Sequence, residues 1–436
     1  MLTAPERQLI LNCSTEAMER DLLHQTQELL QAPLRWGKVL ASSWQHGVTS
    51  LLYKNLKKVD QGGVIPHEVS RKLLQLYHRT ALVNLLFFKS LGELLERFAS
   101  AGVKVIVLKG PCLAQLIYTD FASRPFRDLD LLIRKEDLRK ARELLFEAGY
   151  TIMPDILGDG FFQEYHFSLP FVKEAGEVKT YLELHWNITD QFMGHTIEIE
   201  DLWGRARPAV LSDHHAFTLC PEDLIAHLSL HLDMHGYLNR AIIGRGDELR
   251  SIFHPYSENR LIWFTDLYEV IGHYRSEIDW AALVEYSKQA GTEGSIATSL
   301  TLMNLLFGPV VDKEVLKELE PPRTTFLKRS LFRWLLTDLA DSGENKVPAQ
   351  TFFRSKLLAT RKGVQFRLIR LVGLWEYILP SKGVVKRRYN FSSRGMLGFF
   401  YCLYVLTALA QCARFLLHIV FYSLKKKLGR SLPTPS

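Results

Sequence analysis

The chain has 436 residues, of which 47% are hydrophobic and 23% charged, and 54 Lys and Arg against 47 Asp and Glu give a formal charge of +7. These values exclude a disordered chain, a collagen-like fibre and a disulfide miniprotein, because there is enough apolar material for sizeable cores. The excess of cations is small for this length, so composition alone does not argue for a nucleic-acid partner. At about 100–200 residues per domain, two to four domains are expected.

The cysteines and the N-terminus point to a reducing compartment. The five cysteines form no CxxC pair and lie in apolar segments, as buried thiols ordinarily do. The first residues carry charges such as Glu6 and Arg7, where a secretory signal needs an uninterrupted apolar stretch. We therefore expect a cytoplasmic protein.

Residues 1–100 are predicted to form an N-terminal helical region, because leucines recur at helical spacing on both sides of a break at 60–66. Residues 101–190 contain short β-branched apolar segments between helical ones, and they are predicted to form a mixed α/β core. In chain order the core is expected to contain a strand at 103–107, a helix at 111–118, a strand at 128–133, a helix at 135–149, and a hairpin of strands at 165–172 and 178–186.

The sharpest chemical feature is the pair of acids in Asp128-Leu129-Asp130, at the start of the second predicted strand. Strand alternation places Asp128 and Asp130 on one face. Side by side the two carboxylates repel each other unless a divalent cation neutralises them, and hard oxygen ligands suit Mg²⁺ or Mn²⁺. The ordinary alternative is a pair of solvated aspartates at a strand entrance.

A further acid, Glu183, lies within the segment YLELHW at 181–186. Alternation sends Leu182 and Leu184 toward the core, and Glu183 and His185 to the opposite face. Exposure at a strand edge is one explanation. A third oxygen donor beside the aspartates would instead complete a two-metal site, which clamps the attacking and leaving oxygens of a phosphoryl transfer.

The junction of the first strand and its helix, Lys109-Gly110, is a candidate phosphate site. A helix N-terminus attracts anions, a glycine allows close approach, and a lysine adds a point charge. A glycine at such a junction is also common for steric reasons alone. Arg124 and Arg127 precede the acids and either grip phosphate oxygens or pair with Asp128 and Asp130.

These segments together resemble a known family. The stretch 105–133, the helix after it and YLELHW at 181–186 resemble the uncharacterised nucleotidyltransferases, a branch of the DNA polymerase beta-like nucleotidyltransferase superfamily. Helical blocks on both sides of the core are similar too, so the resemblance covers most of residues 20–300. These blocks are 46–56, 221–231, 260–267 and 279–291.

The resemblance implies a small mixed sheet, a glycine turn at Gly110, and metal-binding catalytic acids at Asp128, Asp130 and Glu183. It also implies transfer of a nucleoside monophosphate from an NTP to an acceptor hydroxyl, with Mg²⁺ or Mn²⁺ as cofactor and pyrophosphate as product. The superfamily usually has Gly-Ser or Gly-Gly at the turn, whereas here Lys109 precedes a single glycine. The mode of triphosphate binding therefore stays open.

Residues 191–310 are predicted to form a second helical domain. His227, His231 and His235 fall on one helix face, and the third lies about 12 Å along the helix from the first, too far to share a zinc ion. They are expected to line the cleft or to pack under it. Arg260 and Asp266 are expected to pair, with substrate positioning as an alternative role for Asp266.

The C-terminal part is predicted to contain a basic helical region at 311–394 and an apolar, membrane-seeking segment at 395–436. Residues 395–413 are 19 uncharged residues, close to the ~20 that cross a bilayer. Because basic residues flank them on both sides, residues 382–430 are expected to contact an anionic membrane surface at its cytoplasmic face, either spanning or in plane. A buried core helix is the alternative.

We therefore predict an α+β fold, with a small mixed β-sheet nucleotidyltransferase core flanked by α-helical domains and an apolar C-terminal helix. The expected substrates are an NTP and an unknown acceptor on protein, sugar or lipid. The alternative is a catalytically inactive scaffold or binding protein at the membrane, in envelope polysaccharide assembly. Nucleic-acid binding would need a concentrated basic groove with stacking aromatics, and the basic clusters near Lys386 and Lys425 adjoin the apolar segment instead.

Overall fold

The computed structural model describes residues 2–60, 62–153, 167–175, 178–189, 197–235, 252–253, 260–320 and 402. The described residues up to Glu320 form one compact unit. The predicted basic region beyond residue 320 and the apolar segment 395–436, apart from Cys402, lie outside the described residues. Within the part of the chain that is described, no helix combines the length and the apolar character needed to cross a bilayer.

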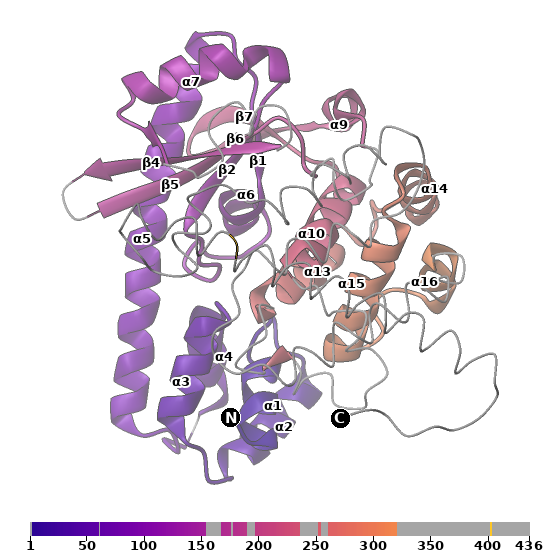
Figure 1. Ribbon diagram of the computed structural model, residues 1–436. Coiled ribbons are helices and arrows are strands. Elements are labelled where there is room, and N and C mark those ends of the chain that lie inside the picture. The colour runs from indigo at the N-terminus through magenta and orange to yellow at the C-terminus, as the bar shows by residue number, and fades with distance from the viewer. Residues whose placement is uncertain are drawn as a thin grey trace. The chain divides into compact units, whose positions relative to one another are not determined.

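The N-terminal region is helical, as predicted. Its helices are α1 (Ala4–Asn12), α2 (Arg20–Leu30), α3 (Trp36–Gln45), α4 (Thr49–Val59) and the long α5 (His67–Ser100). A capping box starts α1, in which Thr3 and Glu6 each bond the other's backbone N–H. In the break before α5, the Asp60 carboxylate accepts hydrogen bonds from the backbone N–H groups of Val64 and Ile65. Figure 1 shows α3 and α4 beside one end of α5 and the sheet beside the other.

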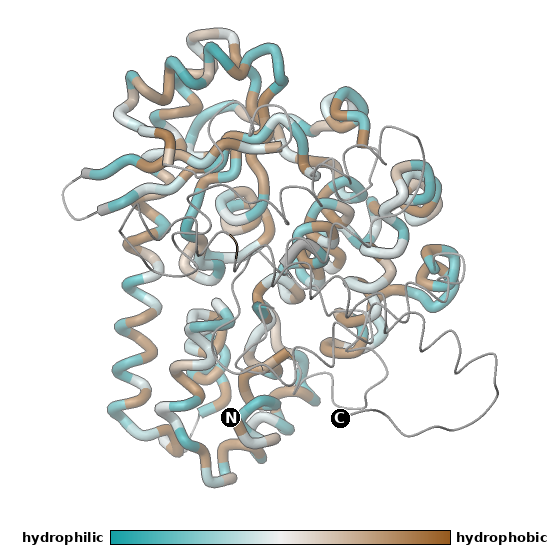
Figure 2. Tube along the Cα trace, in the orientation of Figure 1, coloured by the Kyte–Doolittle hydropathy of each residue, from teal (hydrophilic) through white to brown (hydrophobic). Residues whose placement is uncertain are grey.

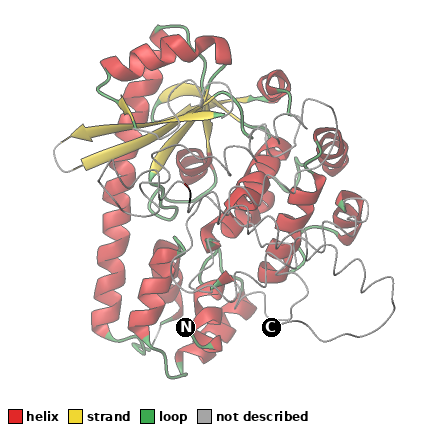
Figure 3. Ribbon diagram, viewed as in Figure 1, coloured by secondary structure: helices red, strands yellow, loops and turns green. Residues whose placement is uncertain are grey.

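A mixed sheet of seven strands forms the centre of the fold, in the order β3-β4-β5-β2-β1-β7-β6 (Figure 3). The strands are β1 (Ile106–Leu108), β2 (Asp128–Leu132), β3 (Thr151–Ile152), β4 (Ser168–Ala175), β5 (Val178–His185), β6 (Arg207–Leu211) and β7 (His214–Thr218). The predicted hairpin is confirmed as β4 and β5, which pair antiparallel. Strand β2 runs antiparallel to β1 and parallel to β5.

The remaining helices contact the sheet or form a helical group after it. They are α6 (Lys109–Leu116), the 3₁₀ turn η1 (Lys135–Asp137), α7 (Leu138–Glu147), α9 (Ile199–Arg205), α10 (Pro221–His235), α13 (Leu261–His273), α14 (Trp280–Ala290), α15 (Glu293–Phe307) and α16 (Lys313–Leu319). Helix α10 packs against α13, α14 and α15. Gly291 ends α14 in the left-handed conformation that glycine adopts at low cost.

The core surrounds the central strands. Helices α5 and α6 both contact β2, whose Leu129 and Leu131 are completely buried. Because strand side chains alternate, burying the leucines directs the aspartates of β2 to the other face. Hydrophilic residues recur along α5 in Figure 2, so this helix is amphipathic rather than uniformly apolar.

Candidate active site

The two acid-bearing strands lie next to each other in the sheet. In the parallel pair of β2 and β5, Asp130 is in register with Glu183, and Leu132 with His185. Since alternate residues share a face, Asp128, Asp130, Glu183 and His185 all project from one side of the sheet. The expectation that acids from two strands share one face is confirmed, and the register adds His185 to them.

Asp130 is the most heavily bonded of these acids. Its Oδ1 lies 2.9 Å from His185 Nε2 and 3.1 Å from Lys109 Nζ, and His185 Nε2 is also 3.3 Å from Glu183 Oε2. Asp130 and His185 are buried, whereas 42% of the Glu183 side chain is exposed. We call Lys109, Asp128, Asp130, Glu183 and His185 the acid cluster. The Lys109 ammonium group and the His185 imidazole thus lie among its three carboxylates, two of which raise the pKa of His185 against the effect of burial.

The protonation of the cluster follows from these contacts. Burial raises the pKa of Asp130, but the Lys109 charge and the hydrogen bond with His185 outweigh it and hold that pKa below its ordinary value. Burial also opposes ionisation of Glu183, but the hydrogen bond and charge of His185 lower its pKa overall. Among the described residues, Asp128 has no such hydrogen-bonded partner. Although part of its surface is exposed, crowding by protein atoms and the charge of Asp130 raise its pKa to about 6.

The cluster contains a set of groups able to hold a cation. One ligand atom each from Asp130, Glu183 and His185 lie within 4.8 Å of one another. Two carboxylates and an imidazole suit Mn²⁺ or Zn²⁺, and carboxylates alone suit Mg²⁺. A cation bound to Asp130 would share its oxygens with Lys109 or displace that ammonium group.

The strand-to-helix junction is tightly built. Lys109 has a left-handed backbone with φ of 47°, which is unusual for a residue with a side chain and directs its ammonium group at Asp130. At Gly110 an added Cβ would lie 2.5 Å from the Cβ of Phe126. The glycine is therefore required by packing, the steric alternative of the sequence analysis. Pro111, the third residue of α6, has no N–H to offer a phosphate.

Arg124 binds a partner that the sequence did not indicate. Its Nε donates to Oδ1 of Asp266 at 3.1 Å and its Nη2 donates to Oδ2 at 2.5 Å, while the Tyr118 hydroxyl donates to Oδ1 at 2.7 Å. Arg124 and Asp266 are both buried. The expected pairing of Asp266 with Arg260 is therefore wrong. Of the two alternatives given for Arg124, the ion pair with Asp128 or Asp130 is not formed, since its partner is Asp266. A bidentate ion pair instead ties the loop before β2 to α13.

The histidines of α10 differ in environment. His227 is buried, and within the described residues neither ring nitrogen has a hydrogen-bond partner. Burial, and then the charges of Lys109 and His185, lower its pKa to about 3, so a neutral imidazole lies near the acid cluster. The side chain of His235 lies outside the described residues.

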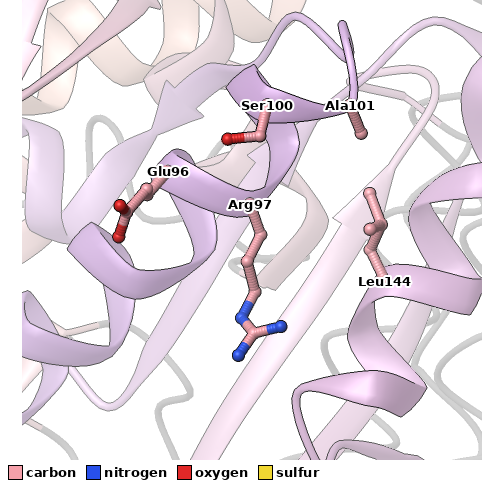
Figure 4. Close-up of a pocket in the computed structure, with 5 residues that line it drawn as sticks. All are labelled: Glu96, Arg97, Ser100, Ala101 and Leu144. Atoms are coloured by element: carbon pink, nitrogen blue, oxygen red, sulfur yellow. The ribbon is translucent and has the colours of Figure 1, made fainter.

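Arg127 is exposed and lines a cavity of about 260 Å³ together with Arg79 and Arg260. Another hollow, of about 450 Å³, lies between α5 and α7 and is shown in Figure 4. Its side chains include Glu96, Arg97 and Leu144, and no member of the acid cluster lines it. The groups that could bind a metal ion or a phosphate therefore lie in the acid cluster and in the cavity lined by the three arginines.

The sequence matches the family described as uncharacterised nucleotidyltransferase over residues 32–308. The chain belongs to this family. The resemblance drawn from the sequence is thereby confirmed. An antigenic nucleotidyltransferase-like protein from Paracoccidioides brasiliensis is a structural neighbour, at 11% identity and a TM-score of 0.29, over 54% of this chain and 92% of that one. A comparison with curated proteins finds no match.

Sequence reasoning placed His185 on the face of Glu183 but gave it no role. The signal was present, because a histidine two residues after an acid on a strand shares its face. What the sequence lacks is the register of β2 against β5, which brings His185 to Asp130. The family match does not assign roles to Lys109, Gly110, Arg124 or Arg127, so the phosphate contacts expected of them remain predictions.

Proposed function

We propose that the protein is a metal-dependent nucleotidyltransferase that moves a nucleoside monophosphate from an NTP to an acceptor hydroxyl. The observation that supports this most directly is the convergence of Asp130, Glu183 and His185 from neighbouring strands, in a chain of the nucleotidyltransferase family. Asp128 lies one alternate position before Asp130 on the same face. Clustered acids repel one another, so their presence on a single face favours a cation-binding role over a purely structural one.

The side chains that would hold Mg²⁺ or Mn²⁺ are Asp128, Asp130 and Glu183, with His185 as a further ligand or as the partner that orients two carboxylates. A bound divalent cation would supply positive charge to the phosphate oxygens as negative charge develops on them. Asp130 suits this role because its lowered pKa keeps it a carboxylate at neutral pH. Its burial fixes the position of its oxygens.

In the proposed reaction the acceptor oxygen forms a bond to the α-phosphorus, and the bond between that phosphorus and the oxygen bridging to the β-phosphate breaks. Pyrophosphate leaves with the electron pair of the broken bond. The acceptor's proton passes to Glu183, the most accessible carboxylate bonded to His185, and then to solvent. Lys109 stays protonated beside Asp130, because the three carboxylates raise its pKa against the effect of burial.

A transfer assay tests the proposal. The protein is incubated with each α-phosphate-labelled NTP, Mg²⁺ or Mn²⁺ and a cell extract, and the extract is fractionated into protein, sugar, lipid and RNA. We expect label on one fraction, and its loss with Asp130→Asn and with Glu183→Gln. Glu200→Gln is the matched control, because Glu200 is an exposed acid on α9 paired only with Arg134 among the described residues. Transfer that survives both cluster substitutions contradicts the proposal.

The alternative is a catalytically inactive nucleotidyltransferase-fold protein that acts as a scaffold or binding protein. One observation favours it, namely that Lys109 and His185 already bond Asp130 and so partly balance the cluster without a metal ion. Under this alternative no NTP gives labelled product, and Asp130→Asn lowers stability alone. Residues 382–430, predicted to contact an anionic membrane, lie outside the described residues apart from Cys402, so that contact stays a prediction.

A further inference from the structure

Three arginines from distant parts of the chain line one cavity, and one of them directly precedes Asp128. Arg79 comes from α5, Arg127 from the loop immediately before β2, and Arg260 from the N-cap of α13. The cavity measures about 260 Å³. We call it the arginine pocket, and its lining also includes Gly47, Ser50, Asn84 and Phe126.

No acid among the described residues forms an ion pair with these arginines, although the charges of Asp128 and Asp266 act on Arg260. Within the described residues, none of the three arginines has a carboxylate oxygen within ion-pair distance, and the buried Arg124 nearby is committed to Asp266. Burial, and then the charges of Arg124 and Arg127, lower the pKa of Arg260 to about 10. Like charges brought together without counterions cost stability, and such clusters are typical of anion-binding sites.

The fold holds Arg260 in place. The backbone N–H of Ile262 donates to the carbonyl oxygen of His46 at 3.1 Å, which fastens the start of α13 to the end of α3. Arg260 Nε donates to the carbonyl oxygen of Gln45 at 3.3 Å. Gly47 has φ of +72°, and a Cβ there would lie 3.0 Å from Arg260 Nη2. The guanidinium therefore packs on bare backbone, in a position that a side chain at residue 47 would disturb.

Two polar groups in the pocket lining lack partners. The Ser50 hydroxyl and the Asn84 Oδ1 are both buried and, within the described residues, make no hydrogen bond. A buried polar atom without a partner costs free energy, so such groups are usually satisfied by a ligand or by water. The Ser50 hydroxyl can donate to an oxyanion, whereas the Asn84 Oδ1 can only accept a hydrogen bond and would need an N–H donor or water.

We propose that the arginine pocket binds a phosphate-bearing group of the substrate. Guanidinium groups present paired N–H donors that match phosphate oxygens. The cavity is smaller than the about 300–1,000 Å³ of ordinary small-molecule sites, so it suits a phosphate or short polyphosphate rather than a whole nucleotide. Arg127 directly precedes Asp128 in the chain, and the charge of Asp128 acts on Arg260, so the pocket adjoins the start of β2, which carries two of the cluster's acids.

The pocket also offers a phosphate site in place of the strand-to-helix junction at Gly110. Phe126 occupies the space beside Gly110 and Pro111 lacks an N–H, so that junction offers a phosphate little. Phe126 also lines the pocket, and hence the phosphate contacts shift from the turn to the adjoining arginines. The inference rests on the proposed function only for the identity of the ligand, which is either the polyphosphate of the NTP or a phosphate on the acceptor.

The test is calorimetric titration of metal-free protein with inorganic tripolyphosphate at low salt. We expect binding that weakens about tenfold or more in Arg127→Gln and in Arg79→Gln, both exposed positions whose loss leaves the core intact. Arg139→Gln on α7 is the control, since Arg139 is also exposed and lies outside the pocket. No binding, or binding unchanged in both pocket variants, overturns the inference.

Competition identifies the source of the phosphate. If an NTP displaces tripolyphosphate, the pocket takes the donor's phosphates. If a hexose phosphate displaces it and an NTP does not, the pocket takes the acceptor's. Asp130→Asn should retain tripolyphosphate binding while losing transfer, so failure of the catalytic proposal and failure of the pocket are told apart.

Discussion

Replacing Asp266 by Asn tests the ion pair that fastens the loop before β2. The Arg124 guanidinium has both of its bonds to Asp266 inside the protein, where neither partner is exposed. Loss of the charge on one partner leaves the other charge buried without compensation, which costs about 3–5 kcal/mol. The free energy of unfolding of a folded domain is about 5–15 kcal/mol, so the variant is expected to lose a large part of its stability.

The same pair allows a double-mutant cycle. Arg124→Met and Asp266→Leu are made singly and together. The double variant removes both charges and leaves the Tyr118 hydroxyl without its acceptor and the Pro125 carbonyl oxygen without its donor, at about 1–3 kcal/mol for each such group. The double variant should therefore be more stable than the sum of the single losses predicts. The assay is urea unfolding followed by tryptophan fluorescence, because the chain has 8 tryptophans.

The control for this cycle is the surface pair of Arg134 and Glu200, whose Glu200 side chain is 63% exposed. Glu200→Gln should leave stability unchanged, because exposed ion pairs are screened by water. The reasoning is refuted if Asp266→Asn costs less than about 1 kcal/mol, the value typical of a surface pair, or if the double variant is no better than additive.

Three further predictions follow from single contacts. Gly110→Ala should lower the free energy of unfolding in urea by about 1–3 kcal/mol, because the alanine Cβ would meet the Cβ of Phe126. Adding Phe126→Ala should not restore the lost stability, since alanine keeps the Cβ atom. Burial, with nearby acids, raises the pKa of Glu269 from 4.5 to about 7. The folded state therefore binds the Glu269 proton more tightly than the unfolded state, and the contribution of Glu269 to stability falls as pH rises from 4.5 to 7. Glu269→Gln should therefore be more stable than the natural protein at pH 8, with the difference gone near pH 4; an equal gain at both pH values contradicts this. Lys109→Met removes a cation bonded to Asp130, so it should lower thermal stability without metal and tighten Mn²⁺ binding several-fold in calorimetry, whereas weaker Mn²⁺ binding would show that Lys109 supports the site.

The sequence predicted the elements that carry strong local patterns. The alternation in Asp128-Leu129-Asp130 indicated a strand with both acids on one face, and β2 has that arrangement. The segment beginning PEDLIAH was predicted as helix and forms α10. The hairpin β4–β5 was found because two alternating segments flank a short turn.

The hairpin β6–β7 was missed, because its strands are short and β7 opens with His214 and His215 in place of β-branched residues. Its turn contains Ser212 and Asp213, both with positive φ, a pattern that Asn-Gly would have signalled clearly. No local pattern predicted that β7 would pair with β1. Sheet order depends on contacts between distant segments, which periodicity does not report.

The partners of the charged residues were the least predictable feature. Arg124 and Asp266 are separated by 142 positions, and each has several oppositely charged neighbours nearer in sequence. Only the docking of α13 against the loop before β2 selects the pair. The arginine pocket was missed for the same reason, since its three arginines become neighbours only when α5, that loop and α13 meet.

The central claim is that the acid cluster binds a divalent cation, and counting bound Mn²⁺ by electron paramagnetic resonance tests it most directly. Free Mn²⁺ gives a strong signal that falls when the ion is bound. Mn²⁺ is therefore titrated into the natural protein and into the Asp130→Asn variant. We predict that the natural protein and Glu200→Gln take up Mn²⁺ and that Asp130→Asn does not. Uptake by Asp130→Asn equal to that of the natural protein, or no uptake by the natural protein, would contradict the account.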